Sequence, residues 1–468
     1  MRRAIFYLFA LGCFLPGPVH AEPETLEQAW SYAYQINPSL QAERAGLRAT
    51  DEAVSQAQTH WRPSIQATGN LGKTYQYLPA QQRFGTANFA DTTRGYNVQV
   101  TQPIFRGWRT DSETDAAEKQ VLSGRAKLSD AEQQLFLDTA TAFLNTVRDE
   151  AILDIQHENE HVLEEKLVET KARDKYGELT QTDVQQAASR LERSRVARYQ
   201  AESALTNDRA SYMRLVGHMP EKLEIPALRV DKSRTRDDIL QLADTRNPKV
   251  IAAQYDADEA KEEVSLNKGA LLPELDLVGN SGKNWGENST LPGRFDSDQV
   301  LLQLTIPLYD SGTTYSKTRA AEQTATQKRM TLEEARHKAH EAADNAWEAL
   351  REAEAALKAD QAEVDASAKA LEGVKVQSKA GTRTTLDVLN AEQEWLDAKV
   401  DLLKSQHDRD LGILQIVAAI GQLTTDYMLL SVKRYDPEQH YHDVRNQWVG
   451  FSKDDEAYGV PSDQEASQ

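Results

Sequence analysis

Two stretches in each half of the chain alternate between apolar and polar residues, the period of a β-strand with one apolar face. Apolar side chains fill every second position from Val300 to Leu308, and nearly every second position from Tyr96 to Ile104. Shorter stretches beginning at Ile65 and at Leu275 follow the same period. The pattern predicts four strands, over residues 62–77, 92–105, 272–285 and 296–309.

After Pro103 and after Pro307 the pattern changes to that of long, proline-free α-helices. We predict long helices over residues 108–176, 181–216, 312–379 and 385–420. Nearly seventy residues at about 1.5 Å each make a helix of roughly 100 Å. In the last helix, apolar residues recur at alternating spacings of three and four, which is typical of a coiled coil. Shorter helices over 38–61 and 248–271 are each opened by an Asn-Pro pair.

The two halves share this plan because the chain is a tandem duplication. Asn37-Pro38 recurs 210 residues later as Asn247-Pro248, and QVTQPIF at 99–105 recurs 204 residues later as QLTIPLY. We therefore assign residues 22–230 to a first structural repeat and 231–430 to a second. Residues 431–468 form a C-terminal tail, and we expect its end, 452–468, to be disordered.

The N-terminus has the pattern of a secretory signal peptide over residues 1–21. Arg2 and Arg3 precede the apolar run at 5–15, and a small-residue site ends at Ala21. An uncleaved anchor and a lipoprotein modified at Cys13 are the alternatives. Cys13 is the sole cysteine, so cleavage after Ala21 leaves a chain that must be stabilised by packing or assembly.

Composition and charge exclude several classes of protein. The formal net charge is −19, and the basic residues are scattered, so we expect no nucleic-acid partner. Hydrophobic residues make up 40% of the chain, which favours narrow helix–helix interfaces over a thick globular core.

HENEH at 157–161 matches a zinc-peptidase motif formally, but Asn and Glu fill positions that are apolar in such helices. We therefore expect no enzyme activity, no bound metal and no cofactor.

Four strands cannot close a barrel alone, because small closed barrels need about eight. An open sheet would leave two edges exposed to aggregation. The simplest solution is that several chains each contribute four strands to one shared barrel. A soluble β-domain between helical segments is the alternative.

In each half of the chain a short break separates the two long helices, and the residues at the end of the break have the pattern of a helix N-cap. The two breaks contain Thr180-x-x-Asp183 and Thr384-x-x-Asp387. In a capping box the Thr oxygen accepts from the third helical amide, and the acidic side chain accepts from the Thr amide. We expect Thr180 and Thr384 to cap the helices that follow, and capping alone would account for both Asp residues.

The signal peptide, the duplicated order of elements and the motif GTRTTLDVLNAE at 381–392 together resemble the TolC family of outer-membrane efflux and secretion channels. The resemblance covers roughly residues 25–430. It implies a mixed α and β membrane protein that assembles as a homotrimer. A shared twelve-stranded barrel would lie in outer-membrane lipid and continue into a long α-helical coiled-coil barrel across the periplasm.

The resemblance also implies roles for residues at the two breaks. Asp387 and Asn390 match the two acidic ring positions of the family's periplasmic constriction, and Asn390 departs from the pattern because it is uncharged. Arg383 matches an arginine that ties neighbouring hairpins shut, with Thr182 and Asp183 matching its partners. The family tyrosine of this latch is replaced by Ser378. The alternative for Arg383 is a surface arginine in a turn.

The implied function is an exit duct that works with a periplasmic adaptor and an inner-membrane ABC or RND transporter. The YDPE segment at 435–438, followed by Trp448, is similar to the branch that serves type I protein secretion. The alternatives are the outer-membrane subunit of multidrug efflux and a periplasmic adaptor or coiled-coil structural protein without a pore.

Overall fold

The computed structural model describes residues 23–77, 88–226, 228, 235–285, 294–428 and 430–450. The expected signal peptide over 1–21 and the expected disordered end over 452–468 lie outside the described residues. The chain divides into two compact units, and each unit draws on both sequence repeats. The ranges are 1–33, 138–228 and 357–407 for the first unit, and 34–137, 229–356 and 408–468 for the second.

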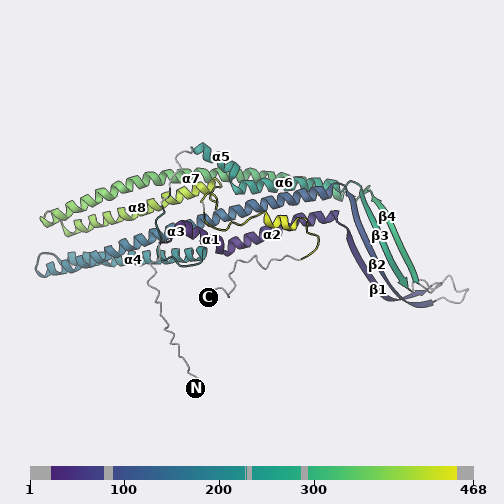
Figure 1. Ribbon diagram of the computed structural model, residues 1–468. Coiled ribbons are helices and arrows are strands. Elements are labelled where there is room, and N and C mark those ends of the chain that lie inside the picture. The colour runs from purple at the N-terminus through teal and green to yellow at the C-terminus, as the bar shows by residue number, and fades with distance from the viewer. Residues whose placement is uncertain are drawn as a thin grey trace, which may run out of the picture. The chain divides into compact units, whose positions relative to one another are not determined.

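The first unit contains the ends of two helical hairpins (Figure 1). The hairpins are formed by α3 (Arg109–Lys175) with α4 (Gln181–Val216), and by α7 (Thr313–Lys379) with α8 (Thr385–Ala419). Leu163 of α3, Leu191 of α4 and Leu389 of α8 are buried together, so the two hairpins pack on each other. These four helices begin and end within one residue of the predicted ranges.

The helix α1 (Leu26–Ile36) was not predicted, and most of it belongs to the first unit. Glu24, just before it, forms a parallel bridge with Leu223, which follows α4. Tyr212 of α4 is fully buried there and packs against Phe143 of α3. Tyr32 of α1 and Tyr212 both pack edge-on against His218, and these contacts fix the N-terminal segment to the end of the first hairpin.

The second unit contains a four-stranded antiparallel sheet in the order β1-β2-β3-β4 (Figure 1). The strands are β1 (Ser64–Tyr77), β2 (Asn88–Arg106), β3 (Glu274–Trp285) and β4 (Arg294–Thr305). The two repeats meet where β2 pairs with β3. In the described chain β1 and β4 each pair on one side only, so they are the two edges of the sheet.

The register gives the sheet one apolar and one polar face. Residues directly opposite each other on neighbouring strands point to the same face. One row across the four strands reads Ile65, Val100, Gly279, Val300, and the adjacent row reads Gln66, Gln99, Asn280, Gln299. Ile65 is 70% exposed and Val300 is 76% exposed, so the apolar row is not covered within the described chain. Exposed apolar surface of this kind marks contact with lipid or with another protein.

Two strand boundaries differ from the sequence prediction by four residues, and the other strand ends agree within two residues. β4 ends at Thr305, although the alternation continues to Leu308. Pro307 lacks the amide hydrogen that a ladder needs, and Asp310 accepts a hydrogen bond from the Thr314 amide at 2.7 Å to start α7. β2 begins at Asn88, four residues before the predicted start, because β1 extends to Tyr77 and pairs with it.

Short helices flank the sheet. α2 (Pro38–Gln58) and α6 (Pro248–Gly269) begin at the proline of each Asn-Pro pair, as predicted, and end two or three residues before the predicted ends. The Asn37 side chain accepts from the amides of Ser39 and Leu40, and Asn247 accepts from Lys249. α2 ends at Gln58 and is followed by a 3₁₀ turn over Thr59–Trp61, which lies inside the predicted helix. The helix α5 (Arg236–Arg246) was not predicted.

The tail folds back onto the first repeat within the second unit. Its short helix α9 (Gln439–Val444) places Tyr441 in a cluster with Val54 of α2 and Val121 of α3. The His440 Nδ1 lies 3.2 Å from Asp51 Oδ2, and the Asp51 side chain is fully buried. Burial raises the pKa of Asp51, and the hydrogen bond from His440 opposes that shift.

None of the helices in the described ranges is long and apolar enough to span a membrane.

Candidate functional site at the hairpin turns

The turn between α3 and α4 reverses the chain through a glycine and closes on a capping box. Gly177 has a φ of 74°, in the region that favours glycine. The Asp183 amide donates to Thr180 Oγ1 at 3.3 Å, and the Thr180 amide donates to Asp183 Oδ2 at 2.9 Å. The hydrogen bonds from Thr180, first its amide and then its hydroxyl, lower the pKa of Asp183. We call residues 176–180 the first turn.

The turn between α7 and α8 repeats this geometry. Gly381 has a φ of 77°. The Asp387 amide donates to Thr384 Oγ1 at 3.2 Å, and the Thr384 amide donates to Asp387 Oδ2 at 2.8 Å. The hydrogen bonds from Thr384, with a smaller contribution from the Arg383 charge, lower the pKa of Asp387. We call residues 380–384 the second turn.

Arg383 lies against its own turn. Its Nε donates to Gln377 Oε1 at 3.2 Å, and its Nη1 lies 3.9 Å from Asp387 Oδ1. Within the described part of this single chain, no hydrogen bond or ion pair joins Arg383 to Thr182 or Asp183. The exposed Thr182 and the half-buried Asp183 lie on the other hairpin. The contacts of one chain therefore bring Arg383 to Asp387, and leave the expected latch partners apart.

Asp387 and Asn390 begin an exposed series along α8. Asp387 keeps 36% of its side-chain surface exposed even though it caps the helix. The series continues at alternating spacings of three and four, through Asn390, Glu394, Asp397 and Asp401. Such spacing places side chains on one face of a helix. The neighbouring Val388, Leu389 and Leu396 are buried, so this face lies opposite the packed seam.

Sequence reasoning missed an arginine that contacts Asn390. Arg190 of α4 donates a hydrogen bond from Nη2 to Asn390 Oδ1, which joins the two hairpins. Nearby, Lys375 of α7 pairs with Glu392 of α8 at 3.0 Å. The pairing of residues 200 positions apart has no local sequence signal. The duplication does single out the position, because Arg190 has the opposite charge to Glu394, the residue that matches it 204 residues later.

The zinc-peptidase motif lies on an exposed surface of α3. His157 and His161 are both exposed, and His161 lies 3.7 Å from Glu165 on the same helix. Among the described residues, no group of three or more His, Cys, Asp or Glu side chains is placed to hold a metal ion.

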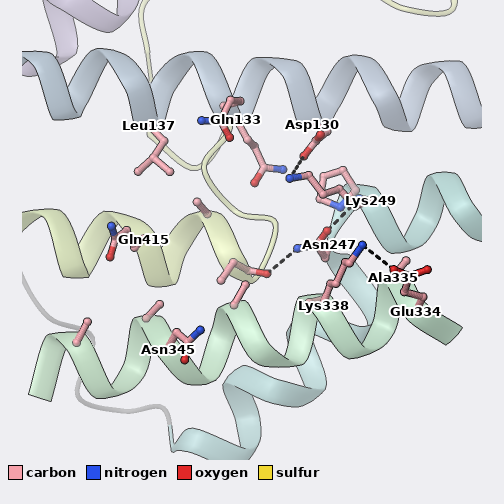
Figure 2. Close-up of a pocket in the computed structure, with 18 of the residues that line it drawn as sticks. Asp130, Gln133, Leu137, Asn247, Lys249, Glu334, Ala335, Lys338, Asn345 and Gln415 are labelled. Carbon is pink, nitrogen blue, oxygen red and sulfur yellow. Dashed lines mark hydrogen bonds and ion pairs between the residues drawn. The ribbon is translucent and has the colours of Figure 1, made fainter. Parts of the chain in front are cut away.

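A separate hollow of about 690 Å³ lies in the second unit, where α8 ends and α6 begins (Figure 2). Its wall is rich in alanine, and it carries two ion pairs. Lys338 Nζ lies 2.7 Å from Glu334 Oε1, and Lys249 Nζ lies 3.7 Å from Asp130 Oδ1. Asn247 Nδ2 donates to the Ala419 carbonyl at 3.0 Å, which ties the two helix ends together. Because each lysine has a carboxylate partner, the hollow has no excess charge to select a ligand.

A family model and several similar proteins all point to the same family of outer-membrane proteins. The model of the family described as outer membrane efflux protein matches residues 30–218 and 239–422. Outer membrane efflux protein BepC of Brucella suis is 30% identical over 97% of this chain and 100% of its own length. Outer membrane protein TolC of Vibrio cholerae is 26% identical over 86% of this chain and 91% of its own. Proteases secretion protein PrtF of Dickeya chrysanthemi is 23% identical over 83% of this chain and 86% of its own.

Solved structures share the fold. The Campylobacter jejuni CmeC outer membrane channel superposes with a TM-score of 0.78 and 14% identity, covering 90% of this chain and 89% of that one.

Proposed function

This chain belongs to the outer membrane efflux protein family and is a protein of the outer membrane, and on that premise we propose that three copies form one exit duct. In this proposal each copy contributes four strands to a twelve-stranded barrel in outer-membrane lipid. The helical hairpins of the three copies form a tunnel that extends into the periplasm.

The single observation that supports the duct most strongly is the unfinished sheet. One face presents the exposed Ile65 and Val300, and the other presents a row of amide side chains that includes Gln66 and Gln299. Both β1 and β4 lack a second neighbour in the described chain. Joining β4 of one copy to β1 of the next satisfies both edges, places the apolar face toward lipid and turns the amide row inward.

The test uses two neighbouring positions on β4. A lysine on the lipid face of a barrel costs roughly 2–4 kcal/mol at mid-membrane, whereas a lysine facing the lumen meets water. We expect Val300→Lys to reduce the amount of trimer in the outer membrane, and the matched Gln299→Lys to leave it near the wild-type amount. Light scattering of the detergent-extracted wild type should give three chain masses, and planar bilayers should show single-channel currents. A stable monomer, or equal loss in the two variants, contradicts the proposal.

We further propose that the hairpin turns form the narrow inner mouth of the duct. Around a threefold axis, Asp387 would form an acidic ring and Asn390 a second, polar ring. A ring of carboxylates focuses negative potential and favours cations. Arg383 of one hairpin would close the mouth by pairing with Thr182 and Asp183 of a neighbouring copy. An inner-membrane complex would open it by breaking these links.

For cargo we propose type I protein secretion, with a periplasmic adaptor and an inner-membrane ABC transporter as partners. The name of the relative PrtF, a proteases secretion protein, supports this proposal, as does the similarity of the YDPE segment. The second candidate is efflux of small molecules with an ABC or RND transporter, which the name of the relative BepC favours.

Deleting the gene separates these two functions. In the secretion case the culture medium loses one or a few proteins by mass spectrometry, and susceptibility to toxic compounds stays close to that of the parent. In the efflux case susceptibility rises and the secreted proteins are unchanged. Restoring the gene must reverse the observed change.

A further inference from the structure

The contact between Arg190 and Asn390 lies beside the buried seam that joins the two hairpins. Leu191 and Leu389, each adjacent in sequence to one partner, are buried together with Leu163. This packing sets the distance between α4 and α8 at the level of the contact. The Arg190 side chain is half-buried and reaches across to the exposed Asn390. The arginine is therefore held in place by two helices and is not a freely moving surface side chain.

Arg190 meets the exposed series of α8 at its one neutral member. The other members are Asp387, Glu394, Asp397 and Asp401, and all of them are acidic. An amide oxygen accepts a hydrogen bond but carries no charge to balance a guanidinium. Within the described chain no carboxylate lies within ion-pairing distance of Arg190. Arg190 therefore makes no direct ion pair at this level of the helix.

The distance to the acidic ring is short. Asn390 follows Asp387 by three residues, which is about 4.5 Å along the helix axis. The Arg190 guanidinium thus contacts α8 at a residue about one helical turn from Asp387. At such distances single charges change the local concentration of small ions even in water.

We propose that Arg190 is a selectivity-determining residue of this channel, because it converts the second ring of the constriction from acidic or neutral to cationic. The inference rests on the proposed duct, in which this face of α8 lines the mouth. Three Arg190 side chains would then surround the axis next to three Asp387 side chains. The adjacent rings of opposite sign weaken the preference for cations further than the loss of a carboxylate at Asn390 does alone.

The test measures reversal potentials in planar bilayers under a potassium chloride gradient. Removing one charge per copy a few ångströms from the ion path should raise the potassium-to-chloride permeability ratio at least about threefold. We expect that rise for Arg190→Gln, which keeps a hydrogen-bonding amide. The matched control is Arg214→Gln, an exposed arginine about 36 Å farther along the same helix, and its ratio should equal the wild-type ratio.

A second variant decides the matter if Arg190→Gln does not assemble. Asn390→Asp keeps the contact and gives Arg190 an acidic partner, so it should raise the ratio by a similar factor. A ratio equal to wild type in an assembled Arg190→Gln channel, or in Asn390→Asp when the first variant fails, overturns the inference while the duct stands. Wild-type protein that conducts no current contradicts the duct itself, and the inference falls with it.

Discussion

The first and second turns occupy matching places in the two repeats, 204 residues apart. Each passes through a glycine with positive φ, Gly177 or Gly381, and each closes with a Thr that caps the next helix. In both, the acidic residue three positions on accepts from the Thr amide. Reversing a long helix within a few residues requires these groups wherever it occurs, because the first amides of the new helix need acceptors.

The exposed side chains after the two caps have diverged in charge. α4 continues from Asp183 through Gln186, Arg190 and Arg193. At the matching positions α8 continues from Asp387 through Asn390, Glu394 and Asp397. One copy of the duplicated helix has become basic and the other acidic. Both copies retain the glycine and the capping residues that the backbone of the turn requires. The charges of their exposed side chains differ, according to what each helix faces.

The largest effect expected at the turns comes from Arg383, which only the second turn carries. Arg383→Ala removes the proposed latch, so we expect a severalfold rise in single-channel conductance in planar bilayers. The matched control is Arg173→Ala, which removes the arginine paired with Glu178 at 3.1 Å in the first turn.

An unchanged conductance in Arg383→Ala would contradict the latch and would mean that Arg383 is only a surface arginine in a turn. An equal rise in Arg173→Ala would mean that any loosened turn opens the mouth, and would remove the special role of the second turn.

A smaller effect should separate the two capping carboxylates. Asp387→Asn keeps an acceptor for the Thr384 amide but removes the charge of the ring, so the cation preference should fall about threefold. Asp183→Asn should leave the preference nearly unchanged and raise conductance, because Asp183 is a proposed latch partner. Reversal potential and conductance measured on the same channels give both values. A loss of selectivity in both variants would place both carboxylates at the ion path.

The elements of this fold could be predicted because their signals are local. Proline-free helical runs, the Asn-Pro starts and the Thr-x-x-Asp caps each lie within a few residues of sequence. The same kind of signal was overlooked at α5, where Thr235 and Asp238 form a capping box ahead of a helix of eleven residues. Strand alternation predicted the sheet, although it extended β4 beyond the point where Pro307 ends the ladder.

The contact of Arg190 with Asn390 could not be predicted in this way. It depends on how two hairpins pack around Leu163, Leu191 and Leu389, and no local pattern encodes that packing. The latch differs again, because its proposed partners belong to different copies of the chain. Residues that act across copies can be proposed from resemblance, and the contacts of one chain do not test them.

The smallest effect concerns the pH dependence of the caps. Asp183 and Asp387 both have a lowered pKa in the folded chain. Their contribution is therefore complete above the unfolded Asp pKa of about 3.9, and is lost as the pH falls through the folded value. We expect amide-exchange protection at the first helical residues of α4 and α8, corrected for intrinsic rates, to drop in that acid range.

Each turn serves as the control for the other in this experiment. Asp183→Asn should remove the acid-dependent loss of protection at the first turn and leave it intact at the second. The Arg383 charge lies near Asp387 only, so the second turn should keep its protection to a lower pH than the first. If both turns lose protection together, in the wild type and in Asp183→Asn alike, the acid transition belongs to the hairpins as a whole. The capping carboxylates would then not control it, and the divergence of the two turns would be confined to their exposed charges.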